Sequence, residues 1–180
     1  TTEIYSLSRH DALPSSIDLD VDPDLSSVPD AYFDVVICSH VLEHLEHPTE
    51  VALALGRKLR PGGTLFLEVP AKRSLRLPSD ARVPGVRGCL NFYDDPTHRR
   101  WVDLRPVASQ LRAVGLTIDA VRPRRLASRT VLLPLYAAAG VATRRYVPAS
   151  VLWDAVGFAE FVTARSPDGT TDHSAEGRRV

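Results

Sequence analysis

Residues 40–47, HVLEHLEH, place three histidines and two glutamates within eight positions. Imidazole nitrogens and carboxylate oxygens are common ligands of Zn²⁺. His40, Glu43 and His44 follow the spacing H-x-x-E-H, which brings two histidines and a carboxylate to one face when the segment is helical. The segment is therefore a candidate metal site, and the elements around it decide whether that interpretation holds.

The neighbouring residues do not favour the long helix that a zinc-protease site needs. An apolar run typical of a strand ends at Cys38, two residues before His40, and Pro48 follows soon after His44. A zinc protease also requires a further ligand from elsewhere in the chain. We therefore predict no protease and no bound metal.

The surrounding residues predict a strand, a helix and a second strand. Residues 33–38, FDVVIC, are apolar without alternation, as in a parallel strand that is buried on both faces. Residues 48–60 have a proline in the first turn and apolar residues at i, i+4 and i+8, and PGG follows, which favours a helix. Residues 64–70, TLFLEVP, are typical of a second buried strand. This order predicts a right-handed βαβ unit.

The flanking segments have weaker patterns. Residues 17–21, IDLDV, alternate as in a strand, and residues 72–97 are a long loop of the kind that often covers a binding site. Residues 103–115 predict an amphipathic helix, and residues 116–121 predict a strand.

The C-terminal third is expected to add helices and one last strand. We expect residues 123–156 to be mostly helical, with breaks at Pro134, Gly140 and Pro148. Residues 158–165 are the expected last strand, and the polar residues 166–180 are an expected disordered tail.

Composition limits the classes of protein that fit the chain. The 180 residues carry 22 basic and 22 acidic side chains and are 44% hydrophobic, which suits one globular domain and argues against a general nucleic-acid binder. Two cysteines, Cys38 and Cys89, are too few for a disulfide framework, so we predict a cytoplasmic protein. Arginines cluster at residues 122–125 and 144–145, and we interpret both clusters as solvated surface, with an anionic-substrate patch as the alternative.

The longest apolar stretch, residues 131–142, is too short to span a bilayer, which takes ~20 residues. We therefore predict no stable membrane insertion. A buried helix or lid is our interpretation of this stretch, and contact with a membrane surface is the alternative.

The first 16 residues differ in character from those that follow. The chain contains no methionine, and residues 1–16 show neither a helical nor a strand period. This segment resembles the conceptual translation of a short-read sequencing adapter. We therefore expect residues 1–16 to be non-native and the chain to be an N-terminally truncated fragment.

Residues 33–70, FDVVICSHVLEHLEHPTEVALALGRKLRPGGTLFLEVP, resemble the second half of a class I S-adenosylmethionine-dependent methyltransferase domain. The likeness is closest to the bacterial group that includes ubiquinone-pathway O-methyltransferases. It rests on FDVV, then LEH, then the PGG that ends the helix, then a strand that ends in Pro70. Residues 93–116, YDDPTHRRWVDLRPVASQLRAVGL, resemble the family's next segment, and the whole likeness covers residues 17–165.

The resemblance implies an α/β fold with a Rossmann-like sheet, helices on both faces and an antiparallel last strand, in which ligand binds at the carboxyl ends of the strands. Only part of that sheet is expected, because the family's first two strands and glycine-rich cofactor loop have no counterpart. None of the ten glycines lies in such a run. The family's first strand lies beside its fourth, so its absence would leave residues 34–38 as an apolar edge, and we predict poor solubility for the 180 residues alone.

The resemblance also implies contacts with S-adenosylmethionine as cofactor. Asp18 or Asp20, at the end of an expected third strand, would accept the adenine amino group; the alternative is that these acids flank a turn. Cys38, Ser39 and His40, at the end of the expected fourth strand, would lie against the methionine part of the cofactor, largely through backbone atoms.

His98 is the candidate general base or substrate contact, with Asp94 and Asp95 as orienting groups. The alternative is a loop histidine that is bonded to a neighbouring aspartate. The resulting prediction is methyl transfer to a small-molecule acceptor, at oxygen, with the chain inactive by itself.

Two alternatives stay open. The chain could be a non-catalytic Rossmann-like binding domain without the glycine-rich loop. Some relatives carry E-x-x-E-H at the position of HVLEH and hold a divalent cation, so His40, Glu43 and His44 could replace that site. His40 in place of a glutamate removes a hard oxygen ligand and would disfavour Mg²⁺.

Overall fold

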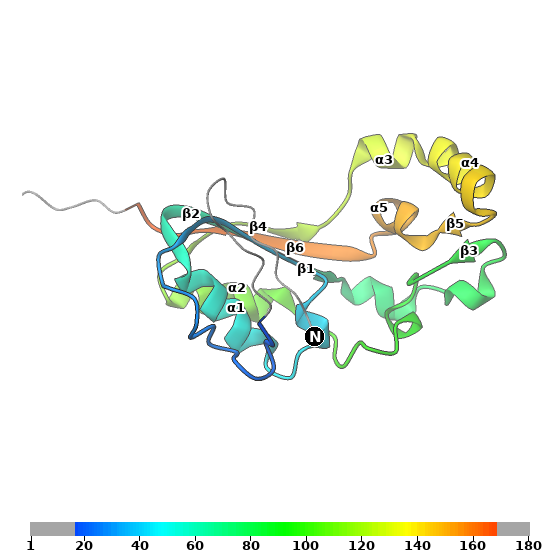
Figure 1. The fold of residues 1–180 in the computed structure, drawn as a ribbon. Helices are drawn as coiled ribbons and strands as arrows, with labels where there is room; N and C mark the ends of the chain where they lie inside the picture. Colours follow the sequence, from blue (N-terminus) through cyan, green and yellow to red (C-terminus); the bar gives the residue numbers. More distant parts are fainter. Residues whose placement is uncertain (1–16, 169–180) are drawn as a thin grey trace, which may run out of the picture.

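The computed structural model describes residues 17–168, so the predictions for residues 1–16 and for most of the tail fall outside the described part of the chain. Its centre is a four-stranded sheet in the order β1-β2-β6-β4 (Figure 1). β1 pairs parallel with β2, whereas β6 runs antiparallel to β2 and β4. The predicted α/β class and the antiparallel last strand are confirmed. The strands are β1 (Phe33–Ser39), β2 (Leu59–Pro70), β4 (Thr117–Pro123) and β6 (Ala159–Arg165).

Two helices pack below the sheet in the view of Figure 1. α1 (Pro48–Arg57) has a proline in its first turn and buries Val51, and α2 (Leu104–Ala113) buries Leu111. The Asp103 carboxylate caps α2 by accepting a backbone N–H of the first turn. The predicted βαβ unit and second helix are therefore confirmed.

α1 ends at Arg57 rather than at Arg60, three residues earlier than predicted, because the chain already pairs with β1 at Leu59. Between β1 and α1, the HVLEH segment forms only a three-residue 3₁₀ helix, η1 (Leu42–His44). The long helix of a zinc protease is absent from this segment, as predicted.

The alternation of residues 17–21 predicts a strand, and that prediction is wrong, because residues 19–21 form a turn. The backbone N–H groups of Val21 and Asp22 donate to the Asp18 carbonyl, and the Asp20 N–H donates to the Asp18 carboxylate at 3.1 Å. Aspartate favours such local bonds over a strand ladder. Leu19 is nevertheless buried in the core.

A second group of short elements lies at one end of the sheet (Figure 1). A parallel pair, β3 with β5, joins the 72–97 loop to the 123–156 segment. The elements are η2 (Lys72–Arg76), η3 (Asp80–Arg82), β3 (Val86–Arg87), η4 (Phe92–Asp94), α3 (Ala127–Val131), α4 (Leu133–Arg144), β5 (Val147–Pro148), η5 (Ala149–Val151) and α5 (Trp153–Val156).

The predicted helix break is confirmed near Pro134, which lies in the first turn of α4, but it is wrong at Gly140, which lies inside α4. Gly140 is buried, and a Cβ there would lie 3.0 Å from Pro148 Cδ and from the Tyr146 carbonyl. This glycine therefore lets β5 approach the helix closely, rather than ending the helix.

The other face of the sheet is open within residues 17–168. Val35 and Ile37 of β1 are 58% and 63% exposed, so the predicted burial of this strand on both faces is wrong. Phe66 and Phe161 stack beside them with ring centroids 5.4 Å apart. Helices covering this second face are not among the described residues, and in that part of the chain β1 pairs only with β2. None of the helices described is long and apolar enough to cross a membrane.

Candidate functional site

The carboxyl ends of β1 and β2 bring together side chains that are distant in the sequence. Ser39, the last residue of β1, lies opposite Glu68 of β2, and the His40 N–H donates to the Glu68 carbonyl at 2.9 Å. His40 has φ of 54°, in the left-handed region that residues with a Cβ seldom adopt. Ser39 and His40 therefore lie at the carboxyl end of the strand, where the sequence placed them.

His40 lies between two carboxylates. Its Nδ1 is 3.1 Å from Glu43 Oε1, and its Nε2 is 3.1 Å from Glu68 Oε1. The contact with Glu68 has the distance of an ion pair but not the geometry of a hydrogen bond. Burial opposes protonation, but the bonds and charges of Glu43 and Glu68 outweigh it and raise the pKa of His40 to about 9. Trp153 covers the imidazole at a centroid distance of 4.9 Å.

Glu68 is held by two further donors. Ser39 Oγ donates to it at 3.2 Å, and Arg124 Nη1 donates at 2.9 Å. Burial of Glu68 opposes its ionisation, but His40 and then Arg124 lower its pKa. Arg124 Nε also lies 3.5 Å from the fully buried Asp154. The interpretation of residues 122–125 as solvated surface is thus wrong for Arg124.

His98 lies near the same edge and is almost buried, with 5% of its side chain exposed. Its Nδ1 is 2.6 Å from the Phe92 carbonyl, and its ring stacks on Phe92 at 4.5 Å. Its Nε2 lies 3.9 Å from both Glu43 Oε1 and Asp95 Oδ2. The expected Asp95 contact is therefore longer than a hydrogen bond, and the Phe92 carbonyl orients the ring.

Asp94, the other expected orienting group, organises its own loop. Its Oδ2 accepts the backbone N–H groups of Asp80, Leu90 and Asn91 at 2.7 to 3.1 Å. The assignment of Asp94 as a partner of His98 is not supported by these contacts.

Three residues at this edge could hold a metal ion, and they differ from the expected set. Glu43, His44 and His98 offer one ligand atom each within 4.8 Å of one another. His44 Nδ1 is 3.2 Å from the Thr97 carbonyl, which leaves its Nε2 for a ligand. Glu43 Oε2 is buried and has no hydrogen-bond partner in the described part of the chain. His98 thus takes the place expected for His40, which faces the two glutamates.

The other expected cofactor contacts, Cys38, Asp18 and Asp20, have side chains that are already buried or bonded to other groups of the protein. Cys38 faces the core, where burial raises the pKa of its thiol to about 12, so only its backbone is available. Asp18 bonds within its own turn, and Asp20 accepts the Glu46 N–H at 2.9 Å and pairs with Arg99 at 3.1 Å. Both acids therefore have protein partners.

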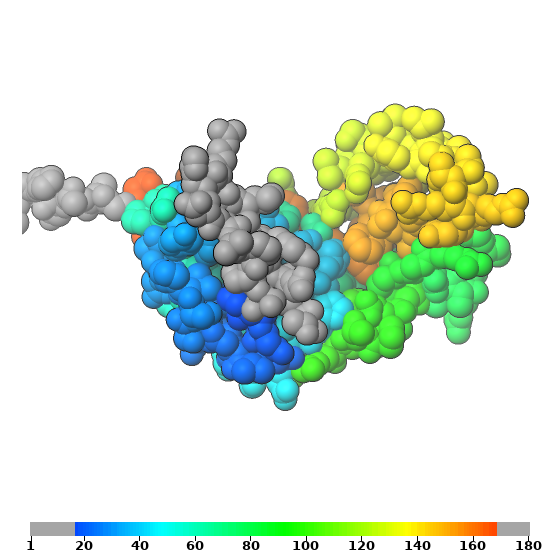
Figure 2. All heavy atoms as spheres, viewed as in Figure 1, coloured from blue at the N-terminus to red at the C-terminus, as the bar shows by residue number. Residues whose placement is uncertain are grey.

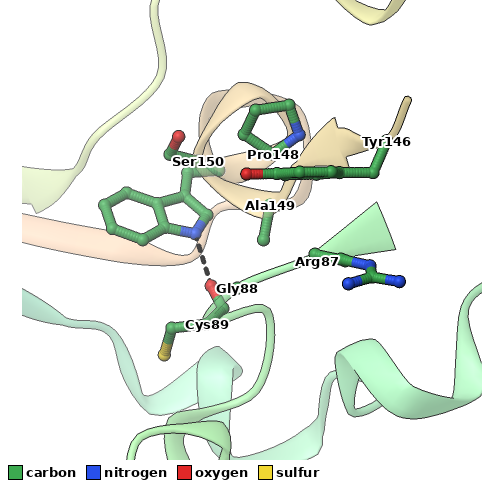
Figure 3. Close-up of a pocket in the computed structure, with 8 residues that line it drawn as sticks. Arg87, Gly88, Cys89, Tyr146, Pro148, Ala149 and Ser150 are labelled. Carbon is green, nitrogen blue, oxygen red and sulfur yellow. Dashed lines mark hydrogen bonds between the residues drawn. The ribbon is translucent and has the colours of Figure 1, made fainter. Parts of the chain in front are cut away.

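A cavity of about 370 Å³ lies between the 72–97 loop and the 123–156 segment, with Arg87 and Tyr146 among the residues that line it (Figure 3). Arg87 and Cys89 line it from the 72–97 loop, and Tyr146 and Trp153 from the 123–156 segment. Trp153 Nε1 donates to the Cys89 carbonyl at 2.7 Å, which ties the two segments together. The Arg87 guanidinium lies 5.7 Å from the Tyr146 ring centroid. A cavity of this size accommodates a small organic molecule.

Sequence reasoning did not single out Glu68, Arg124, Asp154 and Trp153. One signal was present: Glu68 is the only charged residue in the apolar strand TLFLEVP, and Asp154 is the only acid between residues 120 and 159. An isolated acid in an apolar context calls for a cationic partner, although the sequence does not say which one.

The family description "methyltransferase domain" matches residues 5–121. The match begins inside the segment 1–16, whose non-native origin stays a prediction. A ubiquinone biosynthesis O-methyltransferase of Xanthomonas oryzae pv. oryzae (strain PXO99A) is 38% identical over 143 residues, which cover 71% of this chain and 59% of that protein. One from Xanthomonas euvesicatoria pv. vesicatoria (strain 85-10) is 31% identical over 129 residues, which cover 66% of this chain and 52% of that protein. The chain thus spans between half and two thirds of the length of these relatives.

Two solved structures are also similar. The [4+2]-cyclase SpnF is 26% identical with a TM-score of 0.48, over 86% of this chain and 57% of that one. A SAM dependent methyltransferase from Archaeoglobus fulgidus is 22% identical with a TM-score of 0.47, over 84% and 66%.

Proposed function

Because the chain belongs to the family of methyltransferase domains, we propose that it takes part in moving a methyl group from S-adenosylmethionine to an oxygen of a small-molecule acceptor. The relatives named as O-methyltransferases support the choice of oxygen. The observation that carries the proposal is the edge itself, where Ser39 and His40 follow a parallel strand and face Glu68. Glu43, which His40 also contacts, lies 3.9 Å from His98. In α/β sheets such an edge is where ligands bind.

Ser39 is exposed at this edge, so the methionine part of the cofactor can lie against its backbone and that of His40. When bound, the sulfonium centre of S-adenosylmethionine supplies an electrophilic methyl group. The chain's own contribution is to hold the acceptor oxygen in line and to exclude water. Cys38 contributes backbone, and Asp18 or Asp20 would have to exchange a present partner for the adenine amino group.

His98 is the proposed general base. With its Nδ1 proton donated to the Phe92 carbonyl, Nε2 keeps a lone pair that can take the proton of an acceptor hydroxyl. His98 would then hold the proton that the acceptor oxygen loses as that oxygen takes the methyl group that bound S-adenosylmethionine would supply. Glu43 and Asp95, each 3.9 Å from Nε2, would stabilise the imidazolium.

The test is His98→Ala in the protein expressed from the complete gene, with a catechol as acceptor. We expect turnover to fall about 100-fold or more, with the Kd for S-adenosylmethionine in calorimetry nearly unchanged. His47→Ala is the matched control, because His47 is half-exposed and, among residues 17–168, pairs only with Glu50 at 3.6 Å. Unchanged turnover in His98→Ala would remove His98 from the mechanism.

The acceptor itself is proposed to lie between the 72–97 loop and the 123–156 segment. The cavity beside Trp153 supports this, because both segments line it and Trp153 also stands against His40. Arg87→Ala should raise the KM for an acidic catechol such as a dihydroxybenzoate and leave the KM for an uncharged catechol as it is. Equal effects on both acceptors would argue against a role for Arg87 in acceptor choice.

A second candidate, a non-catalytic binding domain, is favoured by one observation: the 180 residues contain no glycine-rich cofactor loop. The same calorimetry separates the two. We expect the protein from the complete gene to bind S-adenosylmethionine and the 180 residues alone to bind it weakly and to be inactive. No binding by the complete protein would favour the binding domain.

A further inference from the structure

α4 presents an apolar surface to solvent. Its inward side lies against β5 at the buried Gly140, whereas its outward side consists of Leu135, Ala138, Ala139 and Ala142, all exposed. Leu135 is 64% exposed, and no polar side chain interrupts this outward side. A helix face of this kind is normally covered.

The preceding residues extend the same surface. Leu126 is 47% exposed, Val131 is 77% exposed and Leu132 is 42% exposed, and on α4 Tyr136 and Val141 are also exposed. α3 and α4 form the upper edge of the molecule in Figure 1, and Figure 2 shows them as an outer lobe. We call residues 126–142 of this lobe the α3–α4 surface.

The charge of this region is one-sided. Residues 120–153 contain six arginines and no aspartate or glutamate, while the other 146 residues carry 16 basic and 22 acidic side chains. Arg124 and Arg129 pair with Asp154. Within residues 17–168 the other four have no carboxylate within ion-pair distance: Arg122, Arg125, Arg144 and Arg145. Arg122 lies over Phe161 of the central sheet, whereas Arg144 and Arg145 lie at the C-terminal end of α4 and place positive charge directly beside the apolar surface.

We propose that the α3–α4 surface docks on the interface of an anionic lipid membrane. Exposed apolar side chains flanked by arginines are the combination that holds a helix in the plane of a bilayer surface, where the apolar side enters the acyl boundary and the cations meet lipid phosphates. α4 has 12 residues and lies on the membrane rather than spanning it.

Other occupants fit less well. A two-fold contact between copies of the chain would bring the same unpaired arginines together, which opposes association. A protein partner would need polar groups to recognise on α4, but apart from Tyr136, Thr143 and Arg144 the exposed side chains of this helix are apolar, and the Thr143 hydroxyl donates to the Ala139 carbonyl. A fluid lipid surface requires no such complementarity.

Docking would also bring the cavity beside Trp153 to the membrane. Pro148 lines that cavity and packs under Gly140 of α4. The proposal itself does not depend on the methyltransferase reaction, and its test uses no acceptor.

The test is flotation of the purified 180-residue chain with vesicles, since aggregates sink and lipid-bound protein rises. We expect flotation with phosphatidylcholine vesicles that contain about 30 mol% phosphatidylglycerol, little with phosphatidylcholine alone, and release in about 0.5 M NaCl. Arg144→Glu with Arg145→Glu should lower the floated fraction about tenfold, and Leu135→Asp should lower it in the same way.

The matched control is Arg105→Glu with Arg112→Glu, which makes the same charge change on exposed positions of α2. It should float like the unchanged chain, and circular dichroism checks that all variants keep their helices. Equal flotation on both vesicle types, equal loss in the control, or full flotation of Leu135→Asp would overturn the proposal. Lipid-free dimers that disappear in Leu135→Asp, without flotation of the unchanged chain, would overturn it in favour of a second copy.

Discussion

Glu43→Gln is expected to lower the pKa of His40 from its raised value by about one unit or more. Glu43 is fully buried, and its Oε1 lies 3.1 Å from His40 Nδ1. Burial alone favours the neutral imidazole, and the two carboxylates reverse that preference. Removing one carboxylate leaves the burial in place, so the pKa must fall.

The size of the effect follows from the shift. A rise from 6.5 to about 9 in the pKa of His40 corresponds to about 3 kcal/mol of folding stability at ~1.4 kcal/mol per pKa unit. The side chain is only 22% exposed, so solvent screens its charge contacts little. Because the folded pKa lies above the unfolded one, this stabilisation is fully present below pH 6.5. The free energy of unfolding should fall as the pH rises from 6.5 through about 9.

Tryptophan fluorescence is a suitable assay, because Trp153 covers His40 and a protonated imidazole quenches a neighbouring indole. In a Trp101→Phe background, Trp153 emission of dilute protein should rise with a midpoint near pH 9, and Glu43→Gln should lower that midpoint. Glu50→Gln is the control, because Glu50 is exposed and pairs with His47. A midpoint near pH 6.5 without any substitution, or one that Glu43→Gln leaves in place, would refute the reasoning.

Three further predictions concern other parts of the molecule. The 180-residue chain should be poorly soluble, and Val35→Lys with Ile37→Lys should raise the soluble fraction after centrifugation, because both side chains are exposed on an edge strand; a sharp cooperative melt of a soluble monomer before substitution would contradict this. Gly140→Ala should lower the free energy of unfolding by about 1–3 kcal/mol in urea titrations, since a Cβ would lie 3.0 Å from the Tyr146 carbonyl; a gain in stability from helix propensity would count against it. Methyl transfer by the protein from the complete gene should be unchanged by a chelator, as the sequence-based prediction of no metal requires. A loss of activity that Zn²⁺ restores in the unchanged protein, but not in His44→Ala, would instead assign a metal to Glu43, His44 and His98.

The sequence predicted the core of the fold well and its first segment poorly. The strands β1 and β2 and the helix α1 carry strong local patterns, because a side chain's burial repeats with the period of its own element. The patterns of α2, β4 and β6 are weaker but still predict these elements. Residues 17–21 also alternate, but they form a turn, since Asp18 can satisfy nearby N–H groups with both its carbonyl and its carboxylate. The low helix propensity of glycine predicted a break at Gly140. The residue instead lies inside α4, where the absence of a side chain leaves room for Pro148.

In the candidate site too, some features follow from the sequence and others from the tertiary structure alone. The sequence by itself determined that Ser39 and His40 follow a parallel strand, because the strand, the helix after it and the next strand each have a local pattern. Only the tertiary structure decided which groups face them. Glu68 contacts His40 from the neighbouring strand, and Arg124 and Asp154 come from the last third of the chain. His98, rather than His40, joins Glu43 and His44 in the candidate metal site. The interaction between two charges depends on their distance in space and not on their separation in the sequence, so the periodicity of the chain could not predict these pairs.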